Sequence, residues 1–151
     1  MTLQDIPHEV THAKRILVAL DGSRNSEVAL EQALHLGKAF HSVIYLMHVI
    51  DIYPESMSVA VDMEEELSHE AREILEKGKR HVEAEGLTCG DTIVHMGGKP
   101  SEFIVREARE RDVDVIVLGS HGRTGLSRLL VGSVSERVIG HAPCPVLVVP
   151  S

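Results

Sequence analysis

The strongest constraint on the fold of this chain is the regular alternation of short aliphatic runs with longer amphipathic stretches. Each run is continuous and rich in β-branched residues, which is typical of a strand buried on both faces of a parallel sheet. The five runs are Arg15 to Leu20, Ser42 to Val49, Thr92 to Met96, Val113 to Gly119, and Pro145 to Pro150. Between them, apolar residues recur at steps of three and four, which indicates helices. This alternation predicts a doubly wound α/β domain: a five-stranded parallel, Rossmann-like sheet in the order 3-2-1-4-5, with helices on both faces.

The length of the chain favours one domain. At 151 residues it can bury enough apolar surface for a single core. We expect residues 14–151 to form this domain and residues 1–13 to be a flexible N-terminal arm. The longest helix is predicted from about Val59 to Glu85. The acidic run from Asp62 to Glu66 is expected at its start, where negative charge favours the helix dipole.

Composition excludes several classes of function. The net charge of −8 argues against binding to nucleic acid or to anionic membranes. Aromatic residues make up only 3%, so platforms for stacking bases are scarce. Cys89 and Cys144 are isolated, which fits a reducing cytoplasm and offers no zinc knuckle. No signal peptide or membrane-spanning run is visible, so we expect a cytoplasmic protein.

Ligands of doubly wound sheets bind at the carboxyl ends of the strands, so the residues that follow each strand are the candidates. After the first run the sequence reads DGSRNS, which is not the GxGxxG of dinucleotide-binding folds. The stretch GGKPS resembles a phosphate loop only in part, because Pro100 interrupts it and is expected in the first turn of a helix. Asp21 is the only carboxylate that we place near the pocket, although Asp21-Gly22 is also typical of a plain turn.

The stretch after the fourth run carries the most informative pattern. Gly119, Gly122 and Gly132 are spaced G-x2-G-x9-G, and Ser133 follows directly. Ser133 and Glu136 have the spacing of a capping box, which predicts Ser133 as the N-cap of a helix. Two arginines, Arg123 and Arg128, lie between the glycines without any acidic residue, so the local charge is positive. A helix start of this kind favours an anion such as a polyphosphate, whereas a flexible connection is the simpler alternative.

These stretches together resemble the universal stress protein family, and in particular its ATP-binding branch, whose loop is G-x2-G-x9-G-(S/T). The resemblance extends over nearly the whole chain. It is carried by ILVALDGS at the first strand, the long acidic helix, DVIVLGSHGRTGLSRLLVGSVSERVI, and the terminal CPVLVVP.

The resemblance implies a role for individual residues. It implies that Asp21 binds the ribose with Ala19 beside it, and that Val49 faces the adenine. Leu118 and Gly119 would line the base and sugar, while Gly122, Gly132, Ser133 and Val134 would meet the phosphates. Arg123 is a further candidate for the phosphates, with a solvated side chain as the alternative.

We therefore expect a nucleotide-dependent regulatory module of the stress response, with ATP as its ligand and with or without Mg²⁺. Two alternatives stay open: a slow ATP-hydrolysing enzyme and a family member that binds no nucleotide. No catalytic base is identifiable, so hydrolysis is expected to be slow at most. The uninterrupted aliphatic strand at the end of the chain predicts a homodimer that pairs through it, and a protein partner is expected but not identified.

Overall fold

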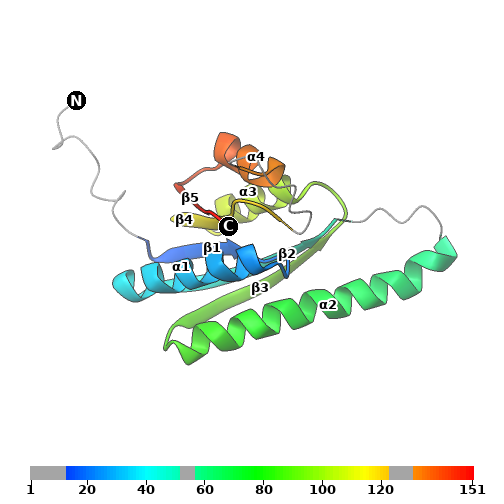
Figure 1. Ribbon diagram of the computed structural model, residues 1–151, viewed down its shortest axis with the longest axis horizontal. Coiled ribbons are helices and arrows are strands. Elements are labelled where there is room, and N and C mark those ends of the chain that lie inside the picture. Colours follow the sequence, from blue (N-terminus) through cyan, green and yellow to red (C-terminus); the bar gives the residue numbers. More distant parts are fainter. Residues whose placement is uncertain (1–12, 52–56, 123–130) are drawn as a thin grey trace.

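The computed structural model describes residues 13–51, 57–122 and 131–151, with only the backbone described for residues 57–61. Its centre is a sheet of five parallel strands in the order β3-β2-β1-β4-β5 (Figure 1), which confirms the predicted fold class. The strands are β1 (Arg15–Ala19), β2 (Val43–Ile50), β3 (Thr88–Met96), β4 (Val115–Gly119) and β5 (Val146–Val149). The central strand β1 is flanked by β2 and β4, so the order of the strands reverses beside it.

Four helices cover the sheet in two layers. They are α1 (Arg24–Phe40), α2 (Met57–Ala84), α3 (Pro100–Glu110) and α4 (Ser133–His141). Helices α1 and α2 pack on one face around aliphatic side chains such as Ile16, Leu34 and Leu46. Helices α3 and α4 cover the other face, where Leu17, Ile104 and Val138 are fully or almost fully buried (Figure 1). The core is aliphatic on both faces, as the scarcity of aromatic residues requires.

The third strand is longer than its apolar run predicts. It begins at Thr88 instead of Thr92, and its first residues are mostly polar. Because β3 is an edge strand that pairs only with β2, part of each face is left to solvent, and polar residues are tolerated there. The register shifts between Ile44 and Leu46, where the ring of Tyr45 lies against Gly90. A Cβ at Gly90 would be 2.5 Å from that ring, so any residue larger than glycine would force the ring or the strand to move.

Helix α2 begins at Met57, two residues before the predicted start. The expectation that the acidic run opens this helix is wrong, because no acidic residue occupies its first turn. The run from Asp62 to Glu66 instead forms an exposed stretch further along, where solvent accommodates the charge. None of the helices in the described part of the chain is long and apolar enough to cross a membrane.

The N-terminal arm falls on residues outside the described part of the chain, except for Ala13. Ala13 is buried, and its carbonyl accepts a hydrogen bond from the hydroxyl of Ser42. The first described residue is therefore attached to the segment that leads into β2. The limits of the arm and of the domain remain expectations.

Candidate functional site

The carboxyl ends of β1 and β4 lie side by side at one edge of the sheet, because the two strands pair in parallel. Asp21 follows β1, and Gly122 follows β4 by three residues. A Cβ built on Gly122 would be 2.9 Å from Oδ2 of Asp21, so these two positions are in direct proximity. The structure thus brings together two predicted site residues that are about a hundred positions apart in sequence.

Asp21 also organises the turn into α1. Its Oδ1 accepts a hydrogen bond from the backbone N–H of Ser23 at 2.8 Å. Ser23 is the N-cap of α1, and its side chain accepts a hydrogen bond from the N–H of Ser26 at 3.2 Å. The turn interpretation of Asp21 is therefore confirmed, and it leaves Oδ2 on the side of Gly122. One oxygen of the Asp21 carboxylate therefore holds the turn, and the other lies at the edge of the site beside Gly122.

The glycines of the predicted phosphate loop allow the chain to approach other groups closely. A Cβ on Gly119 would be 2.7 Å from Oδ1 of Asn25, and one on Gly132 would be 2.9 Å from the carbonyl oxygen of Ser120. The backbone of Gly132 has φ −73° and ψ 165°, which any residue adopts. Gly132 is therefore needed for space and not for an unusual backbone conformation. Its N–H donates to the carbonyl of Ser120 at 2.6 Å, which ties the end of the loop to its beginning.

The start of α4 differs from the prediction. The N-cap is Gly132 and not Ser133, which is the first residue of the helix, and no side chain caps the start. The prediction of Ser133 as N-cap is wrong because the carbonyl that accepts the first bond of the helix belongs to Gly132. The N–H of Glu136 then donates to the carbonyl of Gly132 at 2.9 Å. Ser133 and Val134 are exposed at the start of the helix, where backbone N–H groups lack partners within the helix.

Two polar residues that the sequence analysis missed hold the loop in place. Asn25 is buried, accepts a hydrogen bond from the N–H of His121 at 2.8 Å, and donates to the carbonyl of Val149 at 3.1 Å. Ser135 is buried and donates from its hydroxyl to the carbonyl of Gly119 at 2.8 Å. An asparagine in a first helical turn and a serine near a helix start are common, so neither position carried a signal in the sequence.

The three apolar site residues lie on the face of the sheet that α3 and α4 cover. Leu118 is buried there, and Ala19 and Val49 are half-buried and pack against the same cluster. They stand at or near the carboxyl ends of β4, β1 and β2, respectively. The structure therefore gathers them on one face beneath the site edge. Arg123 and Arg128 lie outside the described residues.

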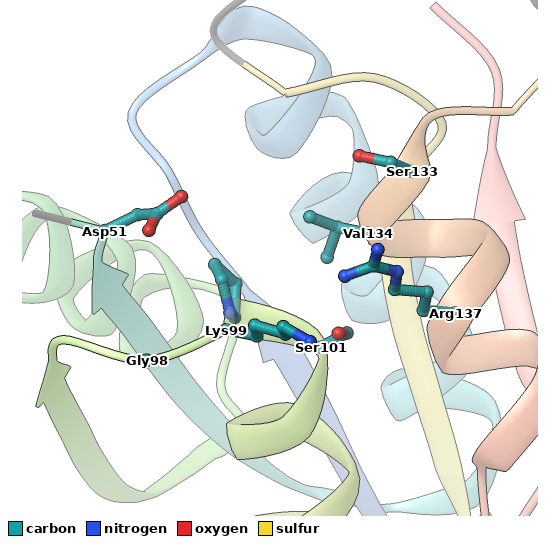
Figure 2. A pocket seen from close by; sticks show the side chains of 8 residues that line it. Asp51, Gly98, Lys99, Ser101, Ser133, Val134 and Arg137 are labelled. Carbon is teal, nitrogen blue, oxygen red and sulfur yellow. The ribbon is translucent and has the colours of Figure 1, made fainter.

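A hollow of about 270 Å³ opens between the starts of α3 and α4 (Figure 2). Its polar lining comes from three places: the end of β2, the start of α3 and the start of α4. The lining residues include Asp51, Lys99, Ser101, Ser133, Val134 and Arg137. Only Ser133 and Val134 were predicted as site residues. Asp51 follows a predicted strand and was a candidate position without an assigned role. Lys99, Ser101 and Arg137 were not assigned to the site, because only the fold brings their segments together.

The turn before α3 is shaped by two consecutive glycines. Gly97 and Gly98 have φ values of 72° and 82°, a region that other residues rarely adopt. A Cβ on Gly98 would also be 2.9 Å from the ring of Phe103. Pro100 occupies the first turn of α3, as predicted, and no side chain caps this helix. Lys99 is therefore the N-cap residue of α3, and this helix, like α4, starts without a side-chain cap bond.

The opposite end of α3 is fixed to the sheet by a buried carboxylate. Glu107 contacts His95 at 2.7 Å and accepts a hydrogen bond from Nε of Arg111 at 2.8 Å. Burial by itself raises the pKa of Glu107, but the hydrogen bonds from Arg111 and His95 outweigh it and hold the pKa below its usual value. The carboxylate of Glu107 thus joins α3 to His95 on β3.

The site offers hydrogen-bond donors and positive charge to an anion. Asp51 lines the hollow, so the expectation that Asp21 is the only carboxylate nearby is wrong. Asp51 directly follows β2, and this position alone was the signal that could have identified it. Within residues 13–51, 57–122 and 131–151, no group of three or more His, Cys, Asp or Glu is arranged to hold a metal ion.

Comparison with known proteins gives a consistent result along the chain. The model of the universal stress protein family matches residues 12–150. Universal stress protein MJ0531 of Methanocaldococcus jannaschii is 38% identical over 140 residues, which cover 90% of this chain and 81% of that protein. The solved structure of MJ0577 from the same organism has a TM-score of 0.78 and 35% identity, and the match covers 92% of this chain and 96% of that one.

A universal stress protein from Archaeoglobus fulgidus, solved in complex with dAMP, is also similar. Its TM-score is 0.67 at 26% identity, and the match covers 89% of this chain and 96% of that one. The sheet order, the family model and these relatives agree over almost the full length of the domain. The chain therefore belongs to the universal stress protein family.

Proposed function

We propose that this chain binds an adenine nucleotide, specifically ATP, at the carboxyl edge of its sheet and acts as a nucleotide-dependent regulatory module in the stress response. One observation carries the proposal: α4 starts at Gly132, which no side-chain bond caps, and Gly132 lies against Ser120, two residues before the Gly122 that lies beside Asp21. Backbone N–H groups at such a start, together with the helix dipole, favour a phosphate.

Each predicted site residue has a role in this proposal. Asp21 binds the ribose hydroxyls, and its proximity to Gly122 supports a position at the edge of the site. Ala19 lies beside Asp21 at the ribose, Val49 faces the adenine, and Leu118 lines the base and sugar; the gathering of these three residues on one face of the sheet is consistent with this arrangement. Gly119 lies beside the sugar. The phosphates are bound by Gly122, Arg123, Gly132, Ser133 and Val134, with or without Mg²⁺.

The dAMP complex of the Archaeoglobus fulgidus relative supports an adenine nucleotide as the ligand class. That complex concerns a protein 26% identical to this one, and it contains a monophosphate. The preference for ATP is supported by this chain's own residues, namely the glycine loop and the positive charge of Arg123 and Arg128.

A slow ATPase is the second candidate. Hydrolysis needs a base that positions water near the outermost phosphate. Asp51 is the carboxylate of the hollow, and it stands on the wall opposite α4 (Figure 2). We expect single-turnover hydrolysis far slower than the ~10 s⁻¹ typical of enzymes, and a rate near that value would favour the enzyme.

We propose in addition that two copies associate through β5. This strand stands at the edge of the sheet and pairs only with β4, and Leu147 on it is 41% exposed. An exposed aliphatic edge strand is a template for pairing with another chain. Sedimentation at micromolar concentration tests the dimer, and a monomer there contradicts it.

The nucleotide proposal is tested by mass spectrometry of small molecules released from the purified, denatured protein, followed by calorimetric titration with ATP and AMP. Asp21→Ala should weaken both ligands about tenfold, because the ribose hydroxyls they share lose a charged acceptor. Asp21→Asn, which keeps an oxygen for the N–H of Ser23, separates the loss of charge from the loss of the turn. Asp62→Ala on the exposed stretch of α2 is the matched control and should change neither affinity.

Two results would contradict the proposal. A protein that carries no nucleotide and binds neither ATP nor AMP would be the nucleotide-free alternative. If Asp21→Ala weakened only ATP, Asp21 would act at the phosphates or a metal ion, and the assignment to the ribose would be wrong.

A further inference from the structure

Helix α2 is longer than the part of the sheet that it covers. Figure 1 shows the start of this helix projecting past the ends of β2 and β3, and every residue from 62 to 66 is exposed. The later part of the helix packs on β2 and β3, and Leu75 and Val82 are buried there in the core. The packing of the core therefore does not explain the exposed stretch at the start of α2.

The apolar side of α2 continues into this exposed stretch. Leu67 and Met63 stand four and eight residues before Ala71, which is fully buried, so the three residues lie along one side of the helix. Leu67 is half-buried, and Met63 is 41% exposed. The side of the helix that faces the core further along thus reaches the surface with its apolar character unchanged.

Two side chains of β3 extend this apolar surface onto the sheet. Val94 and Met96 are 40% and 37% exposed. Successive side chains of a strand point to opposite faces, and Ile93 belongs to the core under α3 and α4, so Val94 and Met96 point to the face that α1 and α2 cover. The end of α2 leads into the start of β3, so the two elements run in opposite directions. At about 1.5 Å per helical residue and about 3.3 Å per strand residue, Met96 lies roughly level with Leu67.

These four apolar side chains form what we call the α2–β3 surface: Met63, Leu67, Val94 and Met96. Neither of the two sites proposed above uses it. The strand proposed for dimerisation, β5, forms the opposite edge of the sheet from β3. The apolar residues proposed for the nucleotide lie on the other face of the sheet. The α2–β3 surface thus remains accessible in a dimer that has bound its nucleotide.

Strong negative charge accompanies the α2–β3 surface. Residues 62–73 contain six acidic residues and one arginine, in a chain of net charge −8. The acidic residues of this stretch that are exposed are Asp62, Glu64, Glu65, Glu66 and Glu73. The helix dipole does not account for them, because its effect is confined to the first turn, where α2 has no acidic residue. An apolar surface beside this much charge suits a partner that is apolar on one side and cationic on the other.

We propose that the α2–β3 surface binds an amphipathic helix of another protein, with lysine or arginine along its polar side. Helices recognise partners in this way by covering an apolar surface with side chains at three- and four-residue steps. A segment added in extended form to the edge of β3 would leave Met63 on α2 uncovered, so a helix beside α2 fits the surface better. The proposed interaction does not require a bound nucleotide.

Charge argues against the other occupants. A second copy of this chain would bring the same acidic stretch, and nucleic acid and anionic lipid are repelled as well. Residues 1–12 of the chain itself carry Asp5 and Glu9 and contain no lysine or arginine. The partner that the charge favours is therefore a basic segment of a different protein.

A short synthetic peptide of leucine and lysine tests the proposal, with its leucines placed along one side of a helix. Fluorescence anisotropy of the labelled peptide with the full chain should show saturable binding, and NMR should show shifts at Met63, Val94 and Met96. The double variant Met63→Gln/Val94→Thr should bind the peptide about tenfold more weakly, because apolar contacts are lost, and should bind ATP as before. Glu64→Gln/Glu65→Gln should weaken the peptide about threefold and reduce the effect of added salt.

Ile139→Gln is the matched apolar control, because Ile139 on α4 is 51% exposed and lies outside the α2–β3 surface. Glu110→Gln at the exposed end of α3 is the control for charge. Both should bind the peptide as the unmodified protein does, and thermal melting should show all variants folded. Circular dichroism should show that the bound peptide is helical.

Several results would overturn the proposal. The peptide may fail to bind the unmodified protein, or bind it as an extended strand. A peptide of the same composition, with its leucines no longer on one side of a helix, could bind equally well, which would reduce the interaction to charge alone. Met63→Gln/Val94→Thr could weaken binding no more than Ile139→Gln does, which would place the peptide elsewhere. A protein that binds the peptide but no nucleotide would contradict only the proposed function.

Discussion

The helices α1 and α4 both begin at the carboxyl edge of the sheet, yet their starts are built in opposite ways. At α1, the side chain of Ser23 caps the helix, and the hydroxyl of Ser26 returns a hydrogen bond to the carbonyl of Ser23 at 2.9 Å. At α4, the N-cap is Gly132 and no side chain occupies the corresponding place. One start is closed by the side chain of its own N-cap residue, whereas the N-cap of the other is a glycine and provides no such bond.

The difference shows why a capping pattern in a sequence is not sufficient to place a cap. The stretch SVSE at residues 133–136 has the spacing of a capping box, but Ser133 does not cap α4. The stretch SRNS at residues 23–26 lacks the glutamate, but Ser23 caps α1. In the first case the carbonyl of Gly132 accepts the first bond of the helix, and the N–H of Gly132 bonds to Ser120, a contact that only the fold brings about.

The largest effect is expected from Gly132→Ala. The added methyl group would be 2.9 Å from the carbonyl oxygen of Ser120, so the loop must move away from the start of α4. We expect ATP affinity to fall about tenfold or more, as charge-assisted hydrogen bonds to phosphate are lost, and stability to fall by about 1 to 3 kcal/mol from overpacking. Calorimetric titration and chemical denaturation measure the two quantities.

Gly140→Ala is the control in the same helix. A Cβ there meets nothing among the described residues within 4 Å, so ATP affinity should stay constant and stability should rise by up to about 1 kcal/mol. Equal ATP affinities of the two variants would show that the close approach at Gly132 does not matter for binding.

A smaller effect is expected at Asn25, which joins the start of α1 to the segment after β4 and to the end of β5. Asn25→Ala removes the buried amide between the N–H of His121 and the carbonyl of Val149, and should cost about 2 kcal/mol in chemical denaturation. Asn25→Asp keeps the acceptor for His121 and loses only the donor, so its cost should be lower at neutral pH. A loss of stability below 0.5 kcal/mol for Asn25→Ala would show that the hydrogen bonds of Asn25 contribute little to the stability of the fold.

The smallest effects compare the two serines directly. Ser23→Ala should destabilise the protein by about 1 kcal/mol, the usual cost of a lost cap. Ser133→Ala should change stability by less than about 0.5 kcal/mol, as is usual for exposed positions, and weaken ATP a few-fold through its hydroxyl. Equal losses of stability in the two variants would mean that Ser133 caps α4 after all.

The sequence was sufficient for the fold because alternating aliphatic runs and amphipathic helices allow few arrangements. It was insufficient where tertiary contacts override local patterns. The first half of β3, Thr88 to Asp91, was not predicted as a strand because its residues are mostly polar. An edge strand tolerates such residues. Asn25 forms two hydrogen bonds to distant backbone groups and Ser135 forms one, and no local pattern in the sequence predicts such bonds.

The candidate site was predictable only in part, for the same reason. Asp21 and the three glycines follow strands or form a spaced motif, so they could be identified. Asp51, Lys99 and Arg137 lie in three separate segments, and their common hollow exists only once the helices have packed.

The position of β1 in the middle of the sheet also determines when the site can form. Arg15 and Asp114, which share a hydrogen bond beside the pairing of β1 with β4, are 99 residues apart, and the contact from Asn25 to Val149 joins residues 124 apart. Contacts over such separations slow folding, because a long loop must close before they form. We therefore expect the proposed nucleotide site to assemble only after β5 has been synthesised, and a nascent chain that stops before β5 should not bind ATP.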